Sequence, residues 1–425
     1  MLSALAVAIA AAGGWFWFLH DPTPNVNVQT PQLPTPNAYD KYFAAANRAV
    51  EDTDISWAVD GIDTTGVRLS QRGMEAVLAR HSWELAQFRQ GLEMDFLMPA
   101  ARSFTHPVLP ERIMGPRGPI DLEKLLLVET RVLMGRGDWP GAMGSRLDAL
   151  ELAIDWPHGG PIMLELAGVT LQVYVNWLFP QIMENLSADE AIVAVRRLEL
   201  IGTGRRPFAD ALREEKRFMQ AALLEVFSKP QWRDELVQTP TAFGEYSGGK
   251  DYRNELRSWK KRQIMRNVTE YLDAWLPIVQ KPYAAYRTPP PLPSDPVCTA
   301  SYGPGEIDLP IIVWIWFMRE KARVEIDFQM ITLALHAYRL QEGEYPERLR
   351  EMTPAIIGGV PQDPFALEGL YGYRRTSEGY LLYSIGPDGV DDGGTPCETK
   401  DPADGSVSHI VRENSRGDIV AGVNL

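Results

Sequence analysis

The chain has 425 residues and a formal net charge of −14, with 45% apolar and 23% charged residues. This length exceeds that of one typical domain, and the composition is that of a globular protein. A nucleic-acid-binding surface needs clustered Lys and Arg, and no long basic run offsets the acidity, so we expect no nucleic-acid partner. The acidity favours solubility and is compatible with cation binding.

The chain opens with an uncharged apolar run, residues 2–19. Its length is close to the ~20 residues that a spanning helix needs, and aromatic residues at its end, Trp15–Trp17, favour the membrane interface. A cleaved signal peptide is the alternative, since Ala10–Ala12 offers small residues, but such a peptide has a basic start and a shorter apolar core. We predict an uncleaved transmembrane helix in residues 1–20.

Two proline-rich stretches divide the rest of the chain. Residues 21–38 contain five prolines and predict a semi-rigid linker between the membrane and the folded part. Residues 281–304, which include PYAAYRTPPPLPSDP, predict a second linker. A helical domain over 39–280 and a smaller domain over 305–425 follow from these boundaries.

The helical domain carries apolar residues at three- and four-residue spacing. We expect helices over 40–50 and 73–97, and a strongly apolar one over 161–183. Further helices are expected over 208–227 and 251–279.

Capping residues mark several helix starts. Asp121 is expected to be the N-cap of a helix that stops at Gly135 to Gly137, and Asp138 caps the next helix. Ser187 and Glu190 have the spacing of a capping box. The stretch 125–153 is weakly similar to one tetratricopeptide hairpin, but no second copy follows at a ~34-residue period. We therefore predict a mostly α fold, with an irregular bundle of helical hairpins.

The C-terminal region combines a helix with short strands. An apolar lead-in, residues 311–318, precedes a helix that Gly343 ends. Residues 371–375 and 379–384 are Tyr-rich strand candidates joined by a hairpin turn. A loop rich in Gly and Asp covers residues 386–394.

These C-terminal elements resemble those of a known family. The order ALHAYRLQEGEYPERL, VPQDPF, YGYRR, YLLYSIGPDG and GDIV, within residues 323–418, is similar to the globular part of the type II secretion major pseudopilin, protein G. The resemblance implies a small α+β domain, in which a long helix packs on a short antiparallel sheet. Two features depart from the family: the predicted anchor has no Gly-Phe cleavage motif, and nearly 300 residues separate it from this region.

The resemblance also implies a structural calcium site in the C-terminal loop. Asp388 and Asp418 match aspartates of the family's loop and closing element, and Ile385 would offer its backbone carbonyl. Asp391 and Asp392 fill the loop between them. Calcium prefers carboxylate and carbonyl oxygens. The alternative is that these Asp-Gly pairs only form turns.

The two cysteines leave two alternatives open. In an oxidising compartment, Cys298 and Cys397 form a disulfide that closes a long loop. Otherwise they are two separate buried thiols, since sequence spacing does not show whether their Cα atoms approach.

No motif assigns an enzymatic reaction, because GxSxG and HExxH are both absent. We predict a non-enzymatic protein of interaction or scaffold type, anchored in a bacterial inner membrane, with its soluble part in the periplasm or outside the cell. Its expected partners are the membrane and other envelope proteins. Two alternatives stay open: a ligand-binding protein or enzyme with an unmarked site in the helical domain, and a component of a secretion or pilus-like system. The sequence indicates no particular small-molecule ligand.

Overall fold

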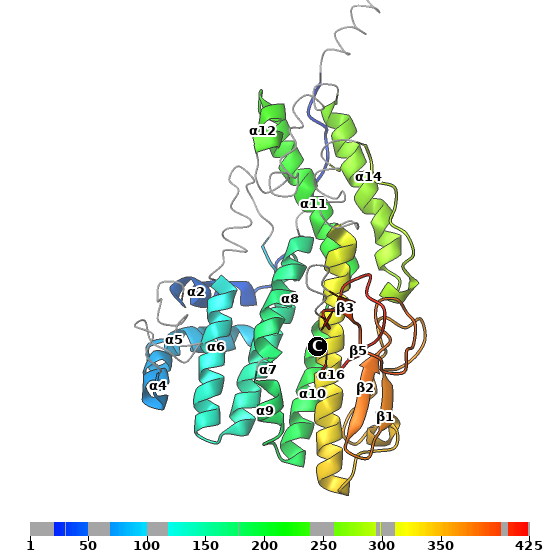
Figure 1. Cartoon of the computed structure of the whole chain (residues 1–425). Helices are drawn as coiled ribbons and strands as arrows, with labels where there is room; N and C mark the ends of the chain where they lie inside the picture. Colours follow the sequence, from blue (N-terminus) through cyan, green and yellow to red (C-terminus); the bar gives the residue numbers. More distant parts are fainter. Residues whose placement is uncertain are drawn as a thin grey trace, which may run out of the picture.

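The computed structural model describes residues 21–29, 31–49, 69–99, 118–176, 178–238, 259–294, 298, 311–400 and 407–423. Figure 1 shows a mostly helical molecule with a small antiparallel sheet at one side, which confirms the predicted fold class at that level. Within the described part of the chain, no helix is both long and apolar enough to cross a membrane. The predicted anchor, residues 1–20, lies outside the described residues.

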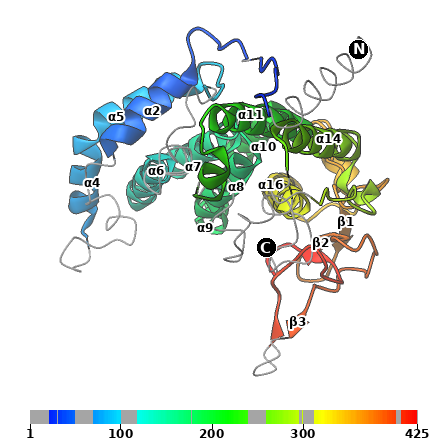
Figure 2. The same cartoon turned by 90° about the horizontal axis from the view of Figure 1, so that it is seen from above.

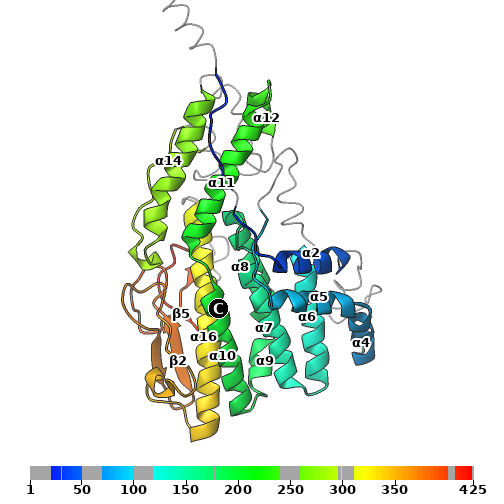
Figure 3. The same cartoon turned by 180° about the vertical axis from the view of Figure 1, so that it is seen from behind.

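The first helices form a pair that crosses the start of the helical array. Helix α2 (Ala38–Ala49) packs against α5 (Ser82–Leu92) and α6 (Gly118–Gly135), as seen from behind in Figure 3. The single helix predicted over 73–97 is two helices, α4 (Gln71–Arg80) and α5. His81 separates them, because its backbone (φ −101°, ψ 19°) leaves the helical geometry.

Helices α6 and α7 (Trp139–Asp155) form the predicted hairpin. Asp138 caps α7, as predicted, and accepts a hydrogen bond from the Gly141 amide at 2.9 Å. The prediction for Asp121 was wrong, because α6 begins at Gly118 and Asp121 lies in its first turn. A carboxylate there still faces the positive end of the helix dipole, which explains the similar sequence signal.

The helix predicted over 161–183 is also divided. Helix α8 (Ile162–Asn176) precedes a short helix α9 (Phe179–Met183), whose second residue is Pro180. Proline has no backbone amide to continue the hydrogen-bond ladder, so it suits a helix start. Helix α10 (Ala188–Gly204) begins with the predicted capping box between Ser187 and Glu190.

Helix α11 (Phe208–Phe227) has the predicted bounds and packs against α8, α12 (Trp232–Gln238) and α14. Helix α14 (Lys261–Val279) begins later than the predicted residue 251, and residues 251–258 lie outside the described part. A short 3-10 helix, η3 (Tyr283–Ala285), follows α14.

The described part of the first proline-rich segment contacts the helical body. The Thr23 hydroxyl donates to the Phe227 carbonyl at 3.1 Å, and Asp21 accepts from the Lys261 amide at 3.1 Å. These two side chains bind backbone groups at the end of α11 and at the start of α14 that have no partner within their own helix. Composition alone does not reveal such contacts.

The long helix α16 (Ile311–Glu342) unites the apolar lead-in and the predicted helix in one element. It packs against α8 and α10, and Figure 2 shows it at the end of a curved row of helices, with the sheet beyond it. Gly343, at φ +85°, ends the helix as predicted, because glycine adopts this left-handed conformation without strain.

The sheet has the order β1 (Gly372–Arg375), β2 (Tyr380–Ser384) and β5 (Ile419–Val420), with both pairs antiparallel. The β1–β2 hairpin confirms the predicted strands. Two short strands, β3 (Thr399–Lys400) and β4 (Val407–Ser408), form a separate pair, and a 3-10 helix, η4 (Leu349–Met352), lies between α16 and β1.

One apolar cluster runs through both parts that the sequence divides. Trp275 of the helical region and Trp316, Phe317 and Phe365 of the C-terminal region all belong to it. Tyr283 contacts both Trp316 and Phe365, with ring centroids 4.9 and 5.3 Å apart. The two regions on either side of residues 281–304 therefore share one core.

Candidate functional site

The aspartate loop, which we define as residues 386–394, follows β2. Pairing of β5 with β2 brings Asp418, which directly precedes β5, beside it. The structure thus gathers the predicted calcium ligands into one neighbourhood. Ile385, the predicted carbonyl ligand, lies directly after β2, and its amide donates to Asp363 at 2.9 Å.

The carboxylates of this neighbourhood bind backbone amides. Asp418 is fully buried and accepts from the amides of Gly394 at 2.6 Å and Asp392 at 3.4 Å. Burial raises the pKa of Asp418, and these two amides oppose the increase because they stabilise the charged form.

The other loop aspartates have similar roles. Asp391 accepts from the Gly393 amide at 2.9 Å, and Asp388 accepts from the Val390 amide at 3.2 Å. Such contacts are those of turns. Among the described residues, no group of three or more His, Cys, Asp or Glu side chains has the arrangement of a metal site. The calcium site therefore stays a prediction.

In this structure the two cysteines are separate thiols, and the disulfide stays a prediction for an oxidising compartment. Cys298 and Cys397 are both buried, and no disulfide joins them. The Cys397 thiol donates to the Gly417 carbonyl at 3.1 Å, within its own loop region. Burial, followed by the charges of Asp388 and Asp418, raises the pKa of Cys397 to about 11, so the thiol is protonated and unreactive at neutral pH.

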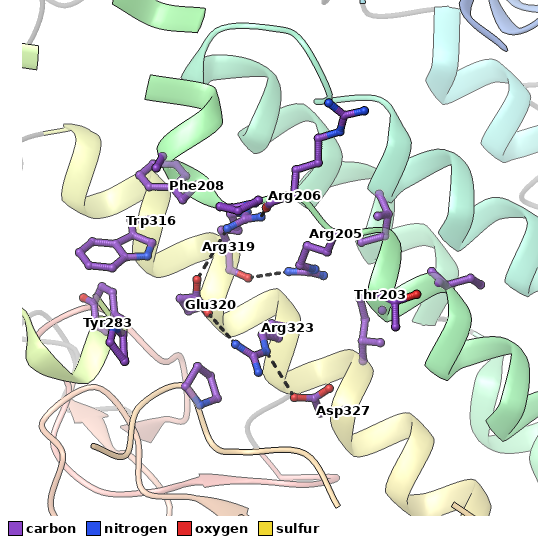
Figure 4. Close-up of a pocket in the computed structure, with 18 of the residues that line it drawn as sticks. Thr203, Arg205, Arg206, Phe208, Tyr283, Trp316, Arg319, Glu320, Arg323 and Asp327 are labelled. Atoms are coloured by element: carbon purple, nitrogen blue, oxygen red, sulfur yellow. Dashed lines mark hydrogen bonds and ion pairs between the residues drawn. The ribbon is translucent and has the colours of Figure 1, made fainter. Parts of the chain in front are cut away.

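A second and larger feature was not indicated by any motif. A cleft of about 1010 Å³ lies where the C-terminal end of α10, the first turn of α11, the end of α14 with η3, and the middle of α16 meet. We call it the arginine cleft, and Figure 4 shows its labelled side chains. Such a volume is that of a small-molecule site.

Most of the charged residues that line the arginine cleft, within the described part of the chain, are basic. The cationic lining residues are Arg205, Arg206, Arg213, Lys281, Arg319 and Arg323. The acidic ones are Glu199, Glu320 and Asp327. This cationic excess stands in a chain whose net charge is −14.

The local sequence explains why the arginines converge. Arg205 and Arg206 lie in the three-residue turn between α10 and α11. Pro207 ends this turn as the N-cap of α11, and no side chain caps that helix. Arg319 and Arg323 are one turn apart on α16, so their side chains share one helix face.

Two arginines lie beneath the cleft surface. Arg319 is 7% exposed, and its Nε lies 2.9 Å from an oxygen of Glu165. The Nη1 of Arg205 donates to the Arg319 carbonyl at 3.3 Å. The other terminal nitrogen of Arg205, Nη2, is inaccessible to solvent and has no hydrogen-bond partner in the described chain.

The positive charges of Arg205 and Arg319 repel each other. Burial, and then the charge of Arg319, lower the pKa of Arg205 to about 10. Burial also lowers the pKa of the nearby His158 to about 3, with further contributions from Arg206, Arg319 and Arg205. The charges of Glu320, Asp327 and Glu165 oppose the decrease at Arg205, so the positive charge of this pair is partly compensated.

The accessible cations are at the rim. Arg206 and Lys281 are exposed, and within the described residues neither forms an ion pair. Arg323 lies 3.8 Å from Glu320 and 3.7 Å from Asp327, which are ion pairs longer than hydrogen bonds. Arg213 pairs with Asp210 one turn earlier on α11. The rim thus keeps donors that a ligand can engage.

Asp327 connects the cleft to the sheet. It accepts from the Tyr371 hydroxyl at 2.7 Å, just before β1. Burial raises the pKa of Asp327 to about 6, and Arg323 opposes the increase. The ladder of Arg319, Glu320, Arg323 and Asp327 along α16 is visible in Figure 4.

Sequence reasoning missed this cleft. The available signal was the Arg205-Arg206 pair between two predicted helices, together with the basic residues of α16. No family model, curated protein or solved structure matches the chain.

Proposed function

We propose that this protein binds a small anionic ligand in the arginine cleft. The observation that carries the proposal is the cationic excess of the cleft lining in an acidic chain. Arg319 pairs with Glu165, whereas Arg205 forms no ion pair among the described residues, and a desolvated guanidinium without such a partner reduces stability. The charge of Arg205, with Arg206 and Lys281 exposed at the rim, favours a ligand that supplies negative charge.

The proposal develops the alternative of a ligand-binding site in the helical domain. It keeps the predicted membrane anchor, envelope location and non-enzymatic role as parts of the hypothesis. The resemblance to the pseudopilin G domain is supported by a long helix followed by an antiparallel sheet. In this chain, however, α16 also packs on α8 and α10 and lines the cleft, so the C-terminal region contributes to the ligand site.

Titration calorimetry with inorganic phosphate tests the proposal on the full chain. We expect saturable binding that weakens as salt increases, because the attraction is electrostatic. Arg206→Gln removes an exposed cation with no ion pair, so the phosphate affinity should fall about tenfold, while the unfolding free energy should change by less than about 0.5 kcal/mol.

Arg136→Gln is the matched control. Arg136 is also exposed, but it pairs with Glu75 at the end of α6 and does not line the cleft. Its replacement should leave phosphate binding unchanged. Equal losses in both variants would show non-specific attraction, and no binding to the unaltered chain would reject the proposal.

A further inference from the structure

The arginine cleft is apolar on one side of its cations. Buried aliphatic side chains line it, among them two from α10 and two from α16: Leu198, Ile201, Ile326 and Met330. We call this part the aliphatic end. A site for a small inorganic anion alone has no use for an apolar lining of this extent, whereas an amphipathic ligand would bury its apolar part there.

The aromatic residues at the other end of the cleft pack against each other. Phe208 stacks on Trp316 with centroids 6.1 Å apart, and Tyr283 meets Trp316 edge-on at 4.9 Å. Figure 4 shows these three rings together on one side of the arginines. Their faces form a packed wall, so the aliphatic end is the side left for a ligand body.

The cleft is also elongated along α16. Arg323 and Met330 both line it, and they are seven residues apart on one helix. At 1.5 Å per residue this is about 10 Å. Such a length exceeds that of a phosphate or of a single ring and suits an extended chain.

We propose that the ligand is an amphipathic phosphate. Its phosphate group contacts Arg206, Lys281 and Arg323, and its alkyl chain lies along the aliphatic end. This inference rests on the proposed anion binding and adds the chemical class of the ligand. The same chemistry belongs to soluble alkyl phosphates and to phosphatidate in a membrane.

A series of n-alkyl phosphates tests the inference. The full chain is placed in phosphatidylcholine nanodiscs, and inorganic phosphate, ethyl, butyl, hexyl and octyl phosphate are titrated, with empty nanodiscs as the blank. We expect the affinity to increase on the order of tenfold for every two methylene groups, as burial of methylenes predicts.

A pair of glycine variants tests where the alkyl chain of the ligand lies. Gly202 lines the cleft next to Ile201, and a Cβ built there meets no atom within 4 Å. Gly204 has the same free space but does not line the cleft. Gly202→Phe should remove the gain from chain length, and Gly204→Phe should keep it.

The outcomes separate the two proposals. If inorganic phosphate binds and a longer chain brings no gain, or if Gly202→Phe keeps the full gain, the amphipathic ligand is rejected and anion binding stands. If no phosphate binds, both are rejected. Flotation with vesicles that contain phosphatidate then identifies the source. If the vesicles capture more of the unaltered protein than of the Gly202→Phe variant, the ligand is a membrane lipid. If they capture both proteins equally, the ligand is soluble.

Discussion

The aspartate loop and the arginine cleft differ in whether their charged side chains have partners within the protein. In the loop, amides within the same region satisfy the carboxylates, as Asp418 illustrates with its bonds to Gly394 and Asp392. In the cleft, Arg205 and Arg206 form no close ion pair among the described residues, and the carboxylates of Glu320, Asp327 and Asp155 act on them only at longer range. Charges that are satisfied internally hold the fold together, whereas charges left without partners are available for a ligand.

The largest expected effect therefore concerns Asp418. Replacement by Ala removes a buried carboxylate and leaves the amides of Asp392 and Gly394 without this acceptor, so we expect a loss of about 3 kcal/mol of unfolding free energy in denaturant titration. Arg205→Gln should cost less than about 0.5 kcal/mol, because it removes a charge whose burial is unfavourable.

Asp391→Ala is the control within the loop, since Asp391 is exposed and its loss should cost no more than about 1 kcal/mol. The comparison between loop and cleft breaks down if Arg205→Gln destabilises the protein as much as Asp418→Ala. Arg205 would then be a structural residue, and its orphan nitrogen would not indicate a ligand site.

Local signals predicted much of the fold. The caps at Asp138, Ser187 and Gly343 were readable, because each depends on residues within one turn of the helix end. Where tertiary packing decides, prediction failed. The break at His81 divides a pattern that is continuous in apolar spacing, and nothing in the residue type marks it.

The arginine cleft was beyond local signals for the same reason. Arg205 and Arg319 are more than a hundred residues apart, and only the packing of α16 against α10 brings them together. The aspartate loop was found because its residues are nearly contiguous. A family resemblance then assigned calcium to it, although contiguous Asp and Gly residues also satisfy one another in turns.

Calcium provides a smaller effect that sharpens the role of the loop. If the loop holds calcium, a concentration tenfold above the dissociation constant should stabilise the chain by about 1.4 kcal/mol, seen as a higher melting temperature. Asp392→Asn should remove this shift, and magnesium at equal concentration should give a smaller one. No shift at millimolar calcium would leave the loop as a turn held by its own amides.

A further expected effect concerns pH and Asp327 in the cleft. Its folded pKa of about 6 is above the ordinary value of about 3.9. The folded state therefore binds the proton more tightly between about pH 4 and pH 6, so the contribution to stability is complete below about pH 4 and is lost as pH increases through 6. Asp327→Asn should flatten this slope in denaturant titrations, relative to the unaltered chain.

Protonation of Asp327 also removes one negative charge from the cleft, beside Arg323. Sulfate keeps its charge over this range, so its affinity should increase about threefold between pH 7 and pH 5. Asp327→Asn keeps an acceptor for the Tyr371 hydroxyl and should bind sulfate with the higher affinity at both pH values. If the increase persists in this variant, another group controls it. If it disappears while binding remains, the buried acid of α16 sets how strongly the arginines attract an anion.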